Sequence, residues 1–232
     1  MASVTRKAQN SRAARRGEIA RRLLVAVEKL LADGENFTEV SVERLVGEAG
    51  VSRSTFYVYF EDKGDLLQVL TEDVMTEVID AARGWWELPP EADRADIEAA
   101  MRVIAAAYRG HMTLMAAVVE ASSYDARVRE RFGELIQLAR GEVASHIAEG
   151  QRRGFVRRDV DAEPVAGWLT WMAERGLYQL VRLADDEAGV ERLTGALTAI
   201  VWNTLYQGAR PERRVVQPPR PASRRRVRTQ TH

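Results

Sequence analysis

The sequence predicts an all-α protein of about nine helices. Apolar residues recur every three or four positions from residue 11 to residue 206, which is the spacing of the buried face of an amphipathic helix. Residues that favour helix ends separate these periodic segments, and no segment alternates apolar and polar residues convincingly enough for a strand. With 232 residues, 46% of them hydrophobic, the chain is long enough for one or two domains with a buried core.

The N-terminal segment changes character along its length. Residues 1–15 are rich in bases and the first ten show no periodicity, so we expect residues 1–15 to form a disordered basic arm. From Ser11 a helical pattern develops, and Gly34 is a candidate C-cap for this first helix.

Two short helices are expected next. Ser41 can cap the first of them, and Gly50 can end it, because glycine adopts a left-handed backbone conformation at little cost. Ser52 can cap the second, which runs through Phe60. The aromatic residues of this segment favour a strand by propensity, but its position between capped helices favours a helix.

A fourth helix is expected to follow a capping box formed by Asp62 and Asp65 and to end near Arg83, where Trp85-Trp86 and Pro89-Pro90 break it. Five further helices are predicted over residues 96–109, 112–121, 125–150, 164–183 and 188–206. Residues 150–161 are expected to form an exposed loop.

The formal net charge is zero, from 34 basic and 34 acidic residues, but the charge is unevenly distributed. Residues 1–22 carry +6 and residues 209–232 carry +7, whereas residues 64–208 carry −9. Basic ends of this kind are typical of proteins that bind a polyanion, although two solvated tails would give the same pattern. We expect the Arg- and Pro-rich tail, residues 209–232, to be disordered.

Residues 42–61 have the pattern of a helix-turn-helix motif, in which a Gly-containing turn joins two short helices. Its inward positions hold Leu45, Ala49, Val51, Phe56 and Tyr59. Its outward positions, at the start of the second helix, hold Ser52, Arg53, Ser54 and Tyr57. In DNA-binding motifs this end of the helix enters the major groove. A helical hairpin with serine caps and no nucleic-acid partner would show much of the same pattern.

Three residues favour DNA binding over the plain hairpin. Arg53 is suited to a bidentate contact with guanine, and Ser54 can donate or accept a hydrogen bond. Lys63 stands at the start of the next helix, where its charge and the helix amides would favour a phosphate. The basic arm could follow the DNA backbone or a minor groove.

Residues 51–67, VSRSTFYVYFEDKGDLL, resemble the signature of the TetR family of transcriptional regulators. The Tyr-x-Tyr-Phe variant resembles most the actinobacterial repressors of the ethionamide-resistance regulator type. The resemblance implies a three-helix DNA-binding domain over residues 16–78 and a C-terminal effector-binding and dimerisation domain over residues 79–208. It also implies DNA contacts from Ser41, Arg53, Ser54, Thr55, Tyr57, Tyr59 and Lys63. Two residues depart from the family pattern: Val46 replaces a small residue, and Tyr59 replaces the commoner histidine.

By the same resemblance, the protein is a homodimer and a repressor that binds a double-stranded DNA operator and is released by a small hydrophobic effector. A two-fold dimer places its two recognition helices about one DNA turn apart, which predicts a palindromic operator. The helices over residues 164–183 and 188–206 are the expected dimer interface, unless their apolar faces only close the core.

An effector pocket is expected in the C-terminal domain, lined by aromatic, Met and Ile residues. The candidates are Trp85, Trp86, Met101, Ile104, Tyr108, Met115, Trp168, Trp171, Tyr178 and Trp202. Thr170, Glu174 and Asn203 are the few polar groups expected there, which suggests a largely hydrophobic effector. The same aromatic residues would serve equally well as plain core.

No catalytic residue, cofactor or metal ligand is expected. The chain has no cysteine and three scattered histidines, and it shows neither a Ser/His/acid set nor a glycine-rich phosphate loop. No run is apolar enough for a membrane span or a signal peptide, so we expect a cytoplasmic protein. The alternatives are an enzyme and a helical adaptor for a protein partner, and the adaptor does not explain the placement of Arg53, Tyr57 and Lys63.

Overall fold

The structure, a computed structural model, describes residues 2–184 and 186–209, with side chains from Ala14 onward. Within these ranges it is helical and contains no strand, so the all-α prediction is confirmed. The helices are α1 (Ala2–Ala32), α2 (Val42–Ala49), α3 (Arg53–Tyr59), α4 (Lys63–Trp86), α5 (Arg94–Gly110), α6 (Met112–Ala121), α7 (Ala126–Arg153), α8 (Ala162–Gln179) and α9 (Glu187–Val201). A 3-10 turn, η1 (Val181–Leu183), follows α8, and a π-helical turn, η2 (Trp202–Tyr206), extends α9. None of the described helices has both the length and the apolar character needed to cross a bilayer.

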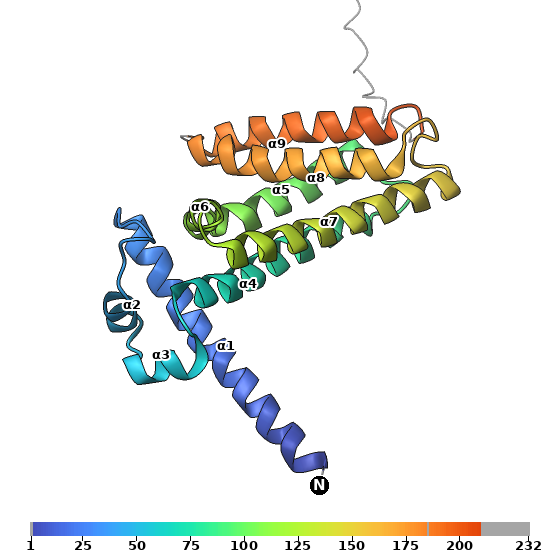
Figure 1. Ribbon diagram of the computed structural model, residues 1–232. Coiled ribbons are helices and arrows are strands. Elements are labelled where there is room, and N and C mark those ends of the chain that lie inside the picture. The colour runs from blue at the N-terminus through green and yellow to red at the C-terminus, as the bar shows by residue number, and fades with distance from the viewer. Residues whose placement is uncertain (1, 185, 210–232) are drawn as a thin grey trace, which may run out of the picture.

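The helices form two groups that α4 connects. Figure 1 shows α1, α2 and α3 gathered at one end of the molecule, and α5 to α9 bundled at the other. Helix α4 starts beside α3 and runs into the bundle, where it packs against α5 and α7, and α7 in turn packs against α8. The predicted domain boundary after residue 78 therefore falls inside one continuous helix, so the two groups share α4 as a rigid element.

The first helix is longer than expected. We expected residues 1–15 to be a disordered arm, but α1 begins at Ala2. Residues 2–16 contain several alanines and arginines, which are good helix formers, and no proline or glycine. A helix that is already nucleated by the packed segment around Leu23 and Leu30 gains one hydrogen bond for each residue added, without a new nucleation cost. The predicted tail lies, from residue 210 onward, outside the described residues.

The fourth helix also extends beyond its predicted end. Trp85 and Trp86 do not break α4, which continues through Trp86 and ends before the two prolines. The buried Trp85 indole donates a hydrogen bond to the Tyr206 hydroxyl at 2.8 Å, so this turn is held by a partner far along the chain. At the start of α4, the Asp62 side chain accepts from the Asp65 amide as expected. The Asp65 carboxylate accepts from the Glu61 amide, one residue before the expected position.

The exposed loop expected over residues 150–161 is confirmed only for residues 157–161, which lie outside the helices and are half-buried or exposed. Helix α7 continues to Arg153, and Phe155 and Val156, which follow it, are buried. They pack with Trp85 and Trp202 in an apolar cluster at the far end of the bundle. Gly150 permits this packing, because a Cβ at this position would lie 2.8 Å from the Phe155 ring and closer still to the Val156 side chain.

Gly150→Ala is expected to lower the free energy of unfolding by about 1–3 kcal/mol, because the added methyl group overpacks this cluster. Gly133→Ala is the matched control. Gly133 lies in the same helix and a Cβ there meets nothing within 4 Å, so alanine should stabilise the helix by about 0.5–1 kcal/mol. Urea unfolding of both variants measures the two effects, and equal effects would contradict the packing described for Gly150.

Candidate nucleic-acid interface and buried pocket

The helix-turn-helix motif is held by local hydrogen bonds at each end of its helices. The Ser41 hydroxyl accepts from the Arg44 amide at 3.1 Å, and the Ser52 hydroxyl accepts from the Thr55 amide at 3.0 Å. Gly50 ends α2 with φ 61° and ψ 35°, the left-handed conformation that the sequence predicts. These bonds fix the start of α3 relative to α2, and all three caps are confirmed.

One face of α3 packs on the protein and the other faces solvent. Phe56 is fully buried in the same core as Leu45 of α2, and Val51 is buried in the turn between the helices. Ala49 and Tyr59, which we expected to point inward, are only half-buried. The solvent face carries Ser52, Arg53, Ser54 and Tyr57. The structure thus presents the predicted outward residues together on one rigidly supported surface.

Arg53 is the one positively charged side chain on α3. Its guanidinium pairs with Glu43 of α2 and lies 5.6 Å from the centre of the Tyr57 ring. The Arg53 and Glu43 side chains are 63% and 56% exposed, so their ion pair contributes little to stability. Another anion could therefore readily replace Glu43 as the partner of Arg53. Sequence reasoning did not identify Glu43, because its pairing with Arg53 depends on the angle between the two helices.

Lys63 does not face the solvent surface beside α3. Its ammonium donates to the backbone carbonyl oxygens of Phe37 at 2.8 Å, Thr38 at 3.0 Å and Val40 at 2.5 Å. An ammonium group has three donors, so all of them are used within the protein. Burial lowers the pKa of Lys63, an effect that the charge of Glu120 opposes. Lys63 thus fastens the loop between α1 and α2 to the start of α4, and the expected phosphate contact would require its ammonium to leave these carbonyls.

The remaining implied DNA contacts lie around α3. Ser41 is exposed at the start of α2, whereas Thr55 and Tyr59 are half-buried. The Thr55 hydroxyl lies 2.7 Å from the Ser52 hydroxyl, which also accepts from the Thr55 amide. Thr55 is therefore engaged with the residue that caps α3. Arg53, Ser54 and Tyr57 are thus the residues of the implied set that combine exposure with a common face.

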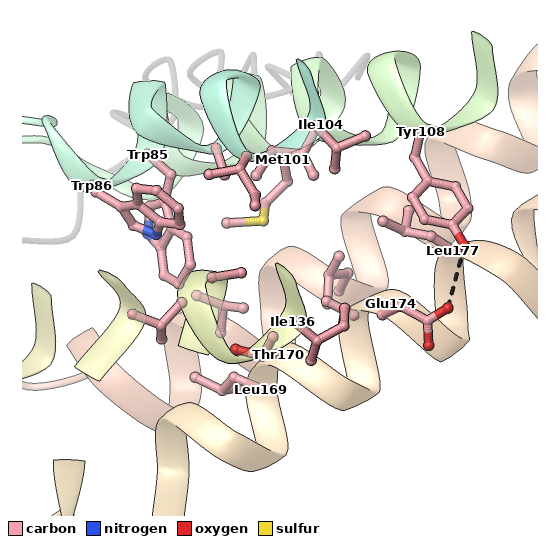
Figure 2. Close-up of a pocket in the computed structure, with 18 of the residues that line it drawn as sticks. Trp85, Trp86, Met101, Ile104, Tyr108, Ile136, Leu169, Thr170, Glu174 and Leu177 are labelled. Carbon is pink, nitrogen blue, oxygen red and sulfur yellow. Dashed lines mark hydrogen bonds between the residues drawn. The ribbon is translucent and has the colours of Figure 1, made fainter. Parts of the chain in front are cut away.

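A cavity lies inside the bundle, between α4, α5, α7, α8 and α9. It measures about 100 Å³ and its walls are almost entirely apolar. Figure 2 shows Trp85 and Trp86 at one end and Tyr108, Leu177 and Glu174 at the other, with Met101 and Ile104 between them. Its volume is comparable to the cavity of about 150 Å³ that binds benzene in an engineered protein, so a small organic molecule fits its scale.

The structure divides the predicted pocket residues into three groups. Five of them line the cavity: Trp85, Trp86, Met101, Ile104 and Tyr108. Three are buried in the surrounding core and do not line it: Met115, Tyr178 and Trp202. Two lie on the outside of the bundle, namely Trp168, which is 79% exposed, and Trp171, which is 41% exposed.

The helical period of α8 explains the two outward tryptophans. Leu169, Thr170 and Ala173 face the cavity, so Trp168 and Trp171, which are three residues apart, share the opposite face. Placing them in the pocket was wrong. Of the expected polar groups, Thr170 and Glu174 line the cavity, whereas Asn203 is exposed on η2.

Comparison with known proteins gives two family matches. Residues 23–70 match the family described as bacterial regulatory proteins, tetR family, and residues 97–207 match the family described as transcriptional regulator EthR, C-terminal domain. The chain is 28% identical over 208 residues to the HTH-type transcriptional regulator EthR of Mycolicibacterium smegmatis, covering 88% of this chain and 95% of that protein. It is 29% identical over 185 residues to EthR of Mycobacterium tuberculosis, covering 79% of this chain and 85% of that protein.

Solved structures share the fold. The transcriptional regulator FadR from Bacillus subtilis, in complex with stearoyl-CoA, aligns with a TM-score of 0.64 at 16% identity, covering 78% of this chain and 96% of that chain. A TetR transcription regulator from Haloarcula marismortui aligns with a TM-score of 0.64 at 21% identity, covering 82% of this chain and 99% of that chain.

Proposed function

Because this chain belongs to the TetR family of transcriptional regulators, with a helix-turn-helix DNA-binding part and a ligand-binding C-terminal domain, we propose that it is a dimeric repressor. Two copies of α3 bind the half-sites of a palindromic operator in the cytoplasm, and a small hydrophobic effector in the cavity releases the dimer from DNA. The observation that carries this proposal is the exposed face of α3, which presents Arg53, Ser54 and Tyr57 on a helix backed by the buried Phe56.

In the proposed complex, α3 enters the major groove. The Arg53 guanidinium leaves Glu43 and forms a bidentate contact with a guanine, while Ser54 and Tyr57 contact neighbouring bases or phosphates. Figure 1 shows the N-terminal end of α1 extending away from the bundle at the end of the molecule that holds α3. Arg15 and Arg21 are exposed on this helix, and contacts from them to phosphates would strengthen binding without sequence preference.

We place the dimer interface on the outer faces of α8, η1 and α9. Large apolar side chains are exposed there: Trp168, Trp171, Leu180, Leu183 and Ile200. An apolar groove between α8 and α9, whose walls include Leu180 and Ile200, continues this surface. Contiguous exposed apolar surface is typical of protein interfaces, and a two-fold axis lets the same patch pair with itself.

Helix α4 connects the proposed effector site to the DNA-binding helices. Its C-terminal half lines the cavity through Met75 and Trp85, and its first residue fastens the loop that precedes α2. A second contact joins the bundle to the DNA-binding helices: Arg127 of α7 donates to both carboxylate oxygens of Asp62, which precedes α4, at 3.1 and 3.0 Å. An effector that favours a different position of α4 would change the separation of the two α3 helices and weaken operator binding.

A mobility-shift assay with DNA that flanks the protein's own gene tests the proposal. We expect selective retention of a palindromic fragment at moderate salt and its release by an effector. Retention of all fragments alike would contradict sequence-specific binding.

Arg53→Ala is expected to lower operator affinity about tenfold or more and to relax discrimination at one base pair in each half-site, because a bidentate contact to guanine contributes about 1–3 kcal/mol. Binding to a panel of operators with single base changes measures this effect. Arg102→Ala is the matched control, since Arg102 is a half-exposed arginine on α5 whose partner is Glu98 of the same helix. If Arg53→Ala weakened binding to every operator equally, Arg53 would contact a phosphate and not a base.

A further inference from the structure

Three buried polar atoms on residues that line the cavity have no hydrogen-bond partner. Two are oxygens, Glu174 Oε2 and Thr170 Oγ1, on residues that are 5% and 9% exposed and one turn apart on α8. The third is a donor, Trp86 Nε1, on a residue at the end of the cavity opposite Glu174. Figure 2 shows the Glu174 and Thr170 side chains in the wall of the cavity. A buried polar atom without a partner costs free energy, so a polar atom that points into a ligand-sized cavity indicates what the ligand supplies.

Comparison with other threonines shows that Thr170 is unusual in this protein. Buried threonines in helices commonly donate to the carbonyl four residues earlier, as Thr71 does at 2.6 Å, Thr194 at 2.8 Å and Thr198 at 2.9 Å. The Thr170 hydroxyl makes no such bond, although it lies in the same kind of helix. It is therefore left to interact with the contents of the cavity.

Glu174 is the one acidic residue in the cavity wall, which contains no basic residue. Its Oε1 accepts a hydrogen bond from the Tyr108 hydroxyl at 3.3 Å, and its Oε2 lies 3.7 Å from Arg175 Nε, beyond hydrogen-bond distance. Burial raises the pKa of Glu174, an effect that Arg175 and Tyr108 oppose. The negative charge of this carboxylate thus lies in an apolar environment, and its contacts with Tyr108 and Arg175 only partly offset the cost of burying it.

We propose that the effector is an amine, a small apolar molecule whose ammonium group pairs with Glu174 and hydrogen-bonds to Thr170. This inference rests on the proposed function of the cavity as the effector site. An ammonium group supplies both the positive charge and the several donors that the two oxygens lack. A carboxylic acid would place a second acidic group beside Glu174, and an alcohol would supply a donor without a charge. The apolar part of the amine extends past Met101 toward Trp85 and Trp86.

Calorimetric titration of the full-length protein with three matched probes tests the inference. Phenylbutylamine, phenylbutanol and 5-phenylpentanoate share the phenylbutyl group as their apolar body and differ in the terminal group. We expect the amine to bind at least about tenfold more tightly than the alcohol, and the acid to bind most weakly. Equal binding of amine and alcohol, or preference for the acid, would overturn the amine inference and leave the cavity as an effector site. If none of the three binds, both the inference and the proposed effector site fail.

One substitution and its control locate the binding group. Glu174→Gln keeps the shape of the side chain and removes its charge, so it should abolish the preference for amine over alcohol. Thr198→Val is the matched control, because Thr198 is buried in α9 but its hydroxyl is already bonded to the Thr194 carbonyl. An amine preference that survives Glu174→Gln would overturn the assignment, and measurable binding of phenylbutanol shows that the variant cavity is intact.

Discussion

Lys63→Met is expected to lower the free energy of unfolding by about 2–4 kcal/mol, because it leaves three backbone carbonyls of the loop between α1 and α2 without their donor. Methionine is unbranched like lysine, so the substitution mainly removes the ammonium group, which also lies 5.3 Å from the centre of the Phe37 ring. The loop precedes α2 directly, and operator binding should therefore fall together with stability. Urea unfolding measures the first effect and mobility shift the second.

Lys29→Met is the matched control for this substitution. Lys29 is 59% exposed and pairs with Glu48, and such a surface pair contributes little to stability. The alternative role for Lys63, a phosphate contact, predicts a different result. In that case Lys63→Met would leave the free energy of unfolding nearly unchanged. The slope of log affinity against log salt concentration would fall by about one, as expected for the loss of one phosphate contact.

Replacing Trp168 and Ile200 together by glutamate is expected to convert the proposed dimer into a monomer. Both side chains are exposed on the single chain, at 79% and 45%, so four buried charges per dimer would oppose association without disturbing the monomer core. Loss of the second half-site contact should lower operator affinity about a hundredfold or more. Sedimentation measures the mass, and mobility shift measures the affinity.

Val103→Glu is the control for the dimer variant. Val103 is 56% exposed on α5 and lies outside the proposed interface, so its substitution should leave both mass and affinity unchanged. A variant with glutamate at positions 168 and 200 that still forms a dimer would contradict the proposed interface. A monomer with full operator affinity would instead contradict the proposal that two copies bind one operator.

The sequence was most informative where the stabilising contacts are local. Ser41, Gly50 and Ser52 act on backbone groups within four residues of themselves, so their roles could be predicted from spacing alone. The outward face of α3 was predicted for the same reason, since the helical period fixes which residues lie opposite Phe56.

The candidate pocket was only partly predictable. Helical spacing showed that Trp168 and Trp171 share a face of α8, but it could not show whether that face meets the cavity or solvent. The prediction of an exposed loop from Gly150 was wrong at Phe155 and Val156 for a similar reason. Their burial depends on Trp85 and Trp202, which belong to other parts of the chain.

The sequence by itself determined that the protein is all-α, where most helices begin and end, and that a helix-turn-helix presents Arg53 to solvent. Only the tertiary structure decided that Lys63 binds carbonyls 23 to 26 residues away, and that Glu174 meets Tyr108 66 residues away inside a cavity. The physical reason is the range of the interactions. Caps and helical period are set within about a turn, whereas the partner of a buried charge depends on how distant helices pack.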